Sequence, residues 1–161
     1  MPKIGNFTYP EISIGQTASY TRHIEERDIQ LFAAVSGDVN PVHLDPVFAA
    51  GTVFKQRIAH GMLTGAVISA ALAMELPGPG TIYLSQSLRF RLPVTIGETV
   101  TVKLEVIEKQ DRRQVVSLDC KAYNKAGKLV ANGIAEVIAP AEKLLIERPP
   151  LPDVEVRSGK I

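Results

Sequence analysis

Residues 60 to 76 read HGMLTGAVISAALAMEL, a run that is apolar almost all round. A surface helix usually carries one apolar stripe and one polar face, so a run without a polar face is typical of a helix buried on several sides. Its longest apolar run, residues 65–76, is shorter than the ~20 residues that a membrane-spanning helix needs. The turn residues Pro77-Gly78-Pro79-Gly80 end the run. The stretch therefore predicts a central buried helix.

After this helix the sequence changes to a period of two, which indicates β-strands. Apolar and polar residues alternate in residues 99–106 (TVTVKLEV) and again in residues 116–123 (VSLDCKAY). Residues 124–128 resemble a hairpin turn that leads into residues 129–138, and residues 81–92 are predicted as one further long strand. Strands with a single apolar face imply an antiparallel sheet packed on one side, against the buried helix, and hence an α+β fold.

Two shorter elements precede the buried helix. Residues 18–24 are typical of an edge strand, and residues 25–35 suit an amphipathic helix that Gly37 ends. Asp45-Pro46 resembles an N-cap followed by proline at the first helical position, which predicts a short helix there.

The bulk composition excludes several function classes. The net charge is +1, from 18 basic and 17 acidic residues, which gives no electrostatic signature of nucleic acid or an anionic membrane as partner. Cys120 is the only cysteine and the first residues lack a signal-peptide core, so we expect a cytoplasmic protein. We predict one domain over residues 1–140 and a proline-rich arm or linker over residues 141–161.

Residues 36–45, SGDVNPVHLD, form a polar cluster ahead of the buried helix. Asp38 and His43 are five positions apart, up to about 17 Å in an extended chain, but Asn40-Pro41 favours a bend between them. A carboxylate and an imidazole that converge in this way suit general acid–base chemistry.

Two alternatives for this cluster stay open at this point. The polar side chains of Ser36, Asp38 and Asn40 can instead cap helix ends and satisfy loop backbone. A metal site is the third possibility, although no CxxC or HExxH motif accompanies the acids and histidines in the sequence. The candidate ligands for such a metal are Asp38, His43, Asp45 and His60.

Gly61 is the second candidate functional residue, because it stands at the predicted start of the buried helix. Backbone N–H groups there are free and could hold a carbonyl oxygen that gains charge, although a packing glycine is the plainer alternative. We expect the neighbouring His60 to be a structural hydrogen-bonder rather than a base.

The runs FAAVSGDVNPVHLDPVFAA (residues 32–50), AHGML (59–63) and LPGPGTIYLSQSLRFRLPVTIGETV (76–100) together resemble the MaoC-like (R)-specific enoyl-CoA hydratases. The resemblance covers about residues 15–140 and its D-x-N-P-x-H element is specific. It implies the hotdog fold, in which a long antiparallel sheet wraps a central helix, and a homodimer whose sheets join edge to edge. The resemblance implies neither a metal nor another cofactor.

Carried onto this sequence, the resemblance implies that Asp38 and His43 hold the attacking water and that Asn40 helps to orient them. The Gly61 amide would bind the thioester carbonyl of an acyl-CoA substrate. It also implies an acyl pocket, for which ordinary core packing is the alternative role, with the candidate residues Ser69, Leu72 and Val137. From charge alone, Lys55, Arg57, Arg89 or Arg91 are candidates to meet the phosphates of CoA.

Two other functions remain open from the sequence. One is a dehydratase of 3-hydroxyacyl chains on acyl carrier protein, which would use the same residues. The other is a non-catalytic acyl-CoA-binding module that kept the hotdog fold, although Asp38, Asn40 and His43 are all present. The compact members of the family end near Pro140, so the tail after that residue is additional. We expect it to be either a link to another domain or an arm that clasps a dimer.

Overall fold

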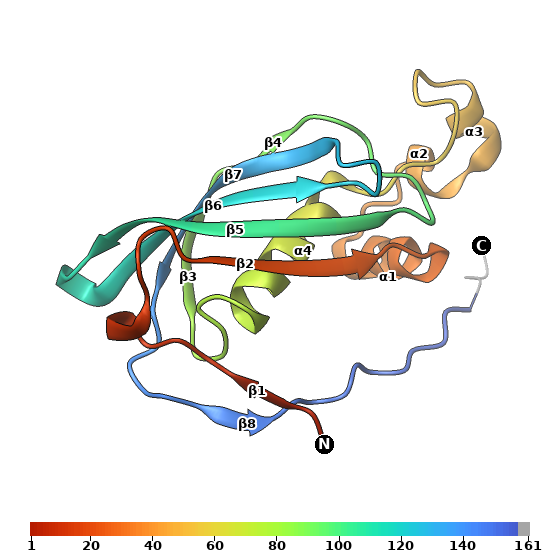
Figure 1. The fold of residues 1–161 in the computed structure, drawn as a ribbon. Coiled ribbons are helices and arrows are strands. Elements are labelled where there is room, and N and C mark those ends of the chain that lie inside the picture. The colour runs from red at the N-terminus through yellow and green to blue at the C-terminus, as the bar shows by residue number, and fades with distance from the viewer. Residues whose placement is uncertain (158–161) are drawn as a thin grey trace.

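The computed structural model describes residues 1–157 and contains one six-stranded antiparallel sheet that curves around a helix (Figure 1). The strand order is β2-β5-β6-β7-β3, with the short β4 also paired to β7, and a separate two-stranded ribbon joins β1 to β8. The strands are β1 Lys3–Gly5, β2 Thr17–His23, β3 Ile82–Gln86, β4 Arg89–Phe90, β5 Thr99–Gln110, β6 Val115–Tyr123, β7 Leu129–Ile138 and β8 Leu145–Glu147. The helices are α1 Glu26–Ser36, α2 Pro41–Leu44, α3 Pro46–Ala50 and α4 Gly61–Met74, with 3₁₀ turns at Tyr9–Glu11 and Arg112–Gln114.

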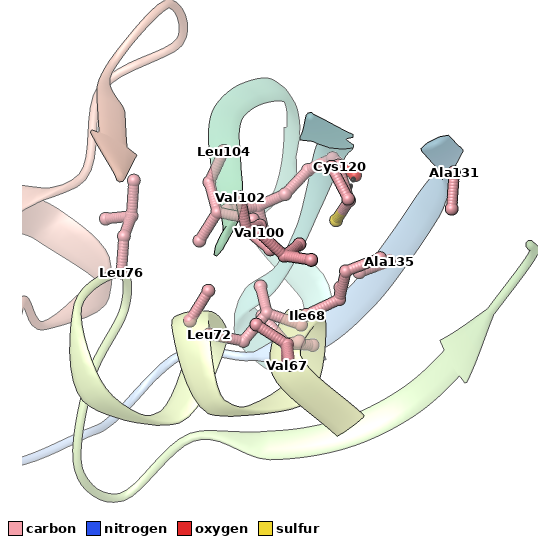
Figure 2. Close-up of a cluster of buried hydrophobic side chains, with 14 of the residues drawn as sticks. Val67, Ile68, Leu72, Leu76, Val100, Val102, Leu104, Cys120, Ala131 and Ala135 are labelled. Carbon is pink, nitrogen blue, oxygen red and sulfur yellow. Dashed lines mark hydrogen bonds between the residues drawn. The ribbon is translucent and has the colours of Figure 1, made fainter. Parts of the chain in front are cut away.

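The predicted buried helix is α4, and it fills the concave face of the sheet. Figure 2 shows Val67, Ile68 and Leu72 on the side of α4 that faces the strands. The alternating residues of β5 and β6 meet them, and fully burying such a side chain contributes about 1.5–3 kcal/mol. The strand side of this core includes Val100, Val102, Leu104, Leu118, Cys120 and Ala122. The two periodicities in the sequence therefore predicted both layers correctly.

The prediction of one long strand over residues 81–92 is wrong, because the chain breaks between β3 and β4. At the break, Ser87 N–H donates to the Ile134 carbonyl and Ile134 N–H donates to Ser87 Oγ, each over 2.9 Å. A Cβ atom on Gly133 would lie 1.7 Å from the Ser87 carbonyl oxygen, so the two backbones approach as closely as only glycine permits. The cause of the break thus lies in β7, outside residues 81–92.

The short strands β1 and β8 lie side by side, away from α3 (Figure 1). The ribbon of β1 and β8 forms there, and Arg148 N–H donates to the Pro2 carbonyl over 2.9 Å. The buried Asn6 side chain bonds Pro79, Glu142 and Leu144, each over 2.9 Å. The first part of the predicted arm is therefore tied to the domain, while its last residues, 158–161, lie outside the described residues. Among residues 1–157, no helix combines the length and the apolar character needed to cross a membrane.

Candidate active site

The polar cluster begins where α1 stops. Gly37 adopts a left-handed conformation with φ of 77°, and its N–H bonds the Ala33 carbonyl, as expected for a helix stop. Ser36 Oγ donates to the Phe32 carbonyl over 2.6 Å and accepts from the Asp38 N–H over 3.1 Å. Ser36 is therefore a helix-end residue, and it fixes the backbone from which Asp38 projects.

Asn40 and Pro41 do more than bend the chain, since they start the short helix α2, which the sequence did not predict. Asn40 Oδ1 accepts from the Val42 N–H over 3.2 Å, and Pro41 occupies the first turn, where its missing N–H costs nothing. The tight turn brings His43 back towards Asp38, and His43 Nε2 lies 3.9 Å from Asp38 Oδ2. The convergence that the sequence predicted is thus present.

The tautomer of His43 follows from its hydrogen-bond partner. The ring is buried, and its Nδ1 lies 2.8 Å from the Ile58 carbonyl oxygen. A carbonyl can only accept, so Nδ1 carries the proton and donates it. In the neutral ring Nε2 then holds the free lone pair, on the side of Asp38, where it can accept a proton from a water.

His60 lies directly against this pair. Its Nε2 is 3.0 Å from the backbone carbonyl oxygen of Asp38, which confirms the expected structural hydrogen bond. Its ring stacks on the ring of His43, with centroids 3.8 Å apart and an interplanar angle of 28°. Phe32 contacts the His60 ring at a centroid distance of 4.9 Å.

The metal alternative fits this geometry poorly. Asp38, His43 and His60 each place one possible ligand atom within 4.8 Å of the others. An imidazole binds a metal in its ring plane, however, and two stacked rings direct their lone pairs side by side rather than at one point. Asp45 is used elsewhere, because its Oδ1 caps α3 by accepting from Val47 and Phe48. Asp38 and His43 retain an exposed carboxylate and a free imidazole nitrogen, the two groups that proton transfer needs.

Gly61 is the first residue of α4, as predicted, and it follows His60 in the chain. No acceptor among residues 1–157 is recorded for its N–H, which is expected in the first turn of a helix. The Gly61 Cα faces the Phe90 ring, since an added Cβ would lie 3.2 Å from it. Gly61, His60 and Phe90 border a hollow of about 260 Å³ that also contacts Arg91 and Leu92.

The three acyl-pocket candidates lie in two different environments. Ser69 borders a hollow of about 480 Å³ between α4 and β3, together with Met62, Tyr83 and Leu88. Leu72 and Val137 are 1% and 0% exposed and belong to the hydrophobic core. Their assignment to an acyl pocket stays a prediction, and Ser69 is the member that borders open space.

The cationic candidates for CoA phosphates also differ from one another. Arg57 forms a two-pronged ion pair with Glu26, whose hydrogen bond raises the pKa of the guanidinium. Arg91 Nε donates to Asn132 Oδ1 over 2.9 Å. Arg57 is therefore committed to tying α1 to the loop before α4. Neither this ion pair nor the Ile58 carbonyl that holds His43 was predictable from the sequence, because both contacts are long-range.

Comparison with known proteins identifies the family of this chain. Residues 10–126 match the family described as MaoC like domain. The (R)-specific enoyl-CoA hydratase of Rhodospirillum rubrum is 47% identical over 133 residues, which are 83% of this chain and 92% of that protein. The 3-hydroxybutyryl-CoA dehydratase of Methylorubrum extorquens is 40% identical over 89% of this chain and 90% of its own length.

Solved structures of similar proteins share the fold of this chain. R-hydratase PhaJ1 from Pseudomonas aeruginosa superimposes with a TM-score of 0.92 at 54% identity, over 97% of this chain and 100% of that chain. The (R)-hydratase of Aeromonas caviae, involved in PHA biosynthesis, gives a TM-score of 0.77 at 40% identity, over 80% of this chain and 98% of that chain. The hotdog fold implied by the resemblance is confirmed, and the chain belongs to the MaoC-like family.

Proposed function

We propose that this protein is an (R)-specific enoyl-CoA hydratase. It adds water reversibly to the double bond of a trans-2-enoyl-CoA and forms a (3R)-3-hydroxyacyl-CoA. The observation that carries the proposal is the 3.9 Å approach of His43 Nε2 to Asp38 Oδ2, beside a helix that begins with a free Gly61 N–H. Relatives of 40–54% identity that are named as hydratases support it.

In the proposed mechanism, a water lies between His43 and Asp38. His43 Nε2 takes one proton from the water, and the remaining hydroxide forms a bond to the β carbon of the enoyl group. The electron pair of the double bond moves toward the thioester oxygen, where the Gly61 N–H stabilises the developing negative charge. Asp38 orients the water, receives the proton from His43 and delivers it to the α carbon. The enolate electron pair returns to form the new C–H bond, so that H and OH add to one face.

Asn40 supports the Asp38–His43 pair through both its backbone N–H and its side chain. Its N–H donates to Asp38 Oδ1 over 3.1 Å, while its side chain caps α2, the helix that carries His43. One residue thereby fixes both partners. This is the orienting role that the family resemblance implies for it.

The alternative function is a dehydratase that takes its acyl chain from acyl carrier protein instead of CoA. The mitochondrial 3-hydroxyacyl-[acyl-carrier-protein] dehydratase of Arabidopsis thaliana is 32% identical over 86% of this chain and 84% of its own length. The same acid–base pair would serve that reaction in the dehydration direction. An acidic carrier protein needs a basic docking patch, and the net charge of +1 gives no general excess of positive charge.

The deciding experiment is a turnover assay of the purified protein with trans-2-enoyl-CoAs of increasing chain length and with chiral analysis of the product. We expect hydration with the (3R) product only. A (3S) product, or turnover of acyl-carrier-protein substrates alone, would contradict the proposal. No turnover of any thioester, combined with saturable acyl-CoA binding, would instead identify a binding module.

We further propose that the protein is a homodimer that joins through β3. β3 is one edge of the sheet, and its Ile82, Tyr83 and Leu84 are exposed apolar residues. The opposite edge, β2, exposes Thr17, Ser19 and Thr21 instead. An exposed apolar edge favours pairing with another strand, while a polar edge does not.

Substitution at the two edges tests the dimer. Ile82→Lys on β3 should dissociate it, whereas Thr21→Lys on β2 should leave its mass in solution unchanged; light scattering after size exclusion measures both. A monomeric wild-type protein would contradict the proposal. We place the protein in the cytoplasm, because its one cysteine is a buried free thiol, which suits a reducing compartment.

A further inference from the structure

His60 contacts both members of the proposed catalytic pair, and it does so through different parts of one ring. The edge of the imidazole bonds the backbone carbonyl of Asp38, with Nε2 3.0 Å from the oxygen. The face of the same ring stacks on His43, with a centroid distance of 3.8 Å. His60 itself is 2% exposed and immobilised as the N-cap residue of α4.

The partners of the two ring nitrogens exclude His60 as the base. The Asp38 carbonyl can only accept, so Nε2 carries the proton and is occupied by that hydrogen bond. The other nitrogen, Nδ1, is buried and has no hydrogen-bond partner among residues 1–157. Neither nitrogen of His60 is therefore available to a substrate, and any contribution to the reaction must pass through Asp38 and His43.

The unpartnered Nδ1 makes histidine a costly residue at this position on stability grounds alone. A buried polar atom without a partner costs about 1–3 kcal/mol, which a phenylalanine at the same position would avoid. Phenylalanine would preserve the stack on His43 but would lose the bond to Asp38. A glutamine would offer an N–H donor but would lose the stack. Of these three side chains, only histidine supplies both an aromatic face and an edge donor.

We propose that His60 is a positioning residue that sets the separation of Asp38 and His43. It ties the Asp38 backbone and the plane of the His43 ring to the rigid start of α4, so the two groups that share the water cannot drift apart. This inference rests on the proposed hydratase function for its kinetic consequence. Its structural consequence, a change at His43, is measurable without any activity.

The kinetic test compares His60→Phe with His60→Gln, using His23→Phe on the exposed surface of β2 as the matched control. Because a displacement near 1 Å can cost about a hundredfold in rate, we expect each His60 variant to lower kcat roughly 10- to 100-fold. KM should change by less than about threefold, since binding of the thioester is not altered. The control should keep the wild-type kcat and KM.

The second readout is the imidazole NMR spectrum of His43. The chain has three histidines, so His43 can be followed with the exposed His23 as internal reference. The His60 ring stacks on the His43 ring, so replacing His60 should move the ring resonances of His43 and leave those of His23 in place.

These two readouts separate the possible failures. If either folded His60 variant keeps kcat within about twofold of wild type, or if the ring resonances of His43 do not move, the positioning role is wrong. A raised KM at unchanged kcat would likewise overturn it, because that result indicates substrate binding. If the wild-type protein hydrates no enoyl-CoA, the hydratase proposal fails, while the NMR spectrum still decides the role of His60.

Discussion

His43 Nε2 lies 3.9 Å from Asp38 Oδ2, too far for a direct hydrogen bond but close enough for one water beside them to bond both. Half of the Asp38 side chain is exposed, whereas His43 is buried and held by the Ile58 carbonyl. The pair thus joins a solvent-facing carboxylate to a fixed imidazole. This asymmetry suits His43 as the base and Asp38 as the group that exchanges the proton.

Removal of either member of this pair should abolish most of the activity without unfolding the protein. We expect Asp38→Asn, Asp38→Ala and His43→Ala each to lower kcat on crotonyl-CoA by about 10²–10⁴-fold. The Asp38→Asn variant keeps an oxygen for the Asn40 N–H, so its loss reports on the charge alone. Circular dichroism and thermal unfolding check that the fold survives.

Asp45→Asn is the matched control for this experiment. Asp45 lies in the same loop, but its carboxylate caps α3, and asparagine caps a helix equally well. Its kcat should equal that of the wild type. Wild-type rates in both Asp38→Ala and His43→Ala would show that the pair has been assigned wrongly.

The proposed oxyanion role of Gly61 can be separated from its packing role by comparing two substitutions. Gly61→Ala keeps the N–H and places a Cβ 3.2 Å from the Phe90 ring. Gly61→Pro also adds a Cβ, removes the N–H and closes a ring through Cγ and Cδ, at a first helical position that tolerates proline. The preceding His60 has φ of −58° and ψ of 136°, the extended conformation that a following proline requires.

We expect kcat of Gly61→Pro to fall about 10²–10³-fold below that of Gly61→Ala, which is the usual cost of losing one oxyanion donor. The comparison uses crotonyl-CoA at saturation and the thermal midpoint of each variant. Equal kcat values in the two variants would mean that Gly61 serves only to accommodate Phe90.

Much of the fold was predictable because its signals are local. The apolar run of α4, the alternation in β5 and β6, and the glycine at position 37 each act within a few residues of the structure they determine. The break between β3 and β4 was not predictable in that way. It depends on Gly133 in another strand, where the missing side chain admits the Ser87 carbonyl.

The candidate site likewise combines features with a local signal in the sequence and features that depend on long-range contacts. The bend at Asn40-Pro41 was a local signal and correctly indicated that Asp38 and His43 converge. The contacts that fix the pair are long-range: the Ile58 carbonyl is 15 positions from His43, and His60 is 22 positions from Asp38. A backbone carbonyl leaves no trace in residue identity, so the sequence could propose the pair but not its supports.

Chain-length selectivity should depend on Ser69, which borders the hollow between α4 and β3. Ser69→Leu adds bulk to that space, so we expect it to lower kcat/KM for octenoyl-CoA by about tenfold relative to crotonyl-CoA. Ala70→Leu is the matched control, because Ala70 is the next residue of α4 and borders a different hollow, near Phe32 and Leu151. The same loss in both variants, or an unchanged profile in Ser69→Leu, would remove Ser69 from the acyl pocket.

Stability at alkaline pH should depend on Cys120, which is fully buried between α4 and the sheet. Burial, with a smaller contribution from the charge of Asp119, raises the pKa of this thiol from 9.0 to about 12. In the unfolded chain the thiol ionises near its ordinary value, so from pH 9 upward ionisation favours unfolding. The stabilising contribution is complete below that pH and is lost as the pH rises toward 12, by up to about 1.4 kcal/mol per pH unit.

The measurement is the free energy of unfolding in urea, from about pH 8 to about pH 10.5, for the wild type and for Cys120→Ala. The alanine variant loses packing at every pH but lacks the titration, so its deficit relative to the wild type should shrink as the pH rises. Burial also raises the pKa of Tyr9 to about 12, but Tyr9 is present in both proteins and cancels in the difference. The pKa of Tyr83 is raised to about 12 by burial and, to a smaller extent, by the charge of Cys120, so this part of the Tyr83 shift belongs to the same difference. A deficit that stays constant across this range would show that the Cys120 thiol ionises equally in the folded and unfolded chains.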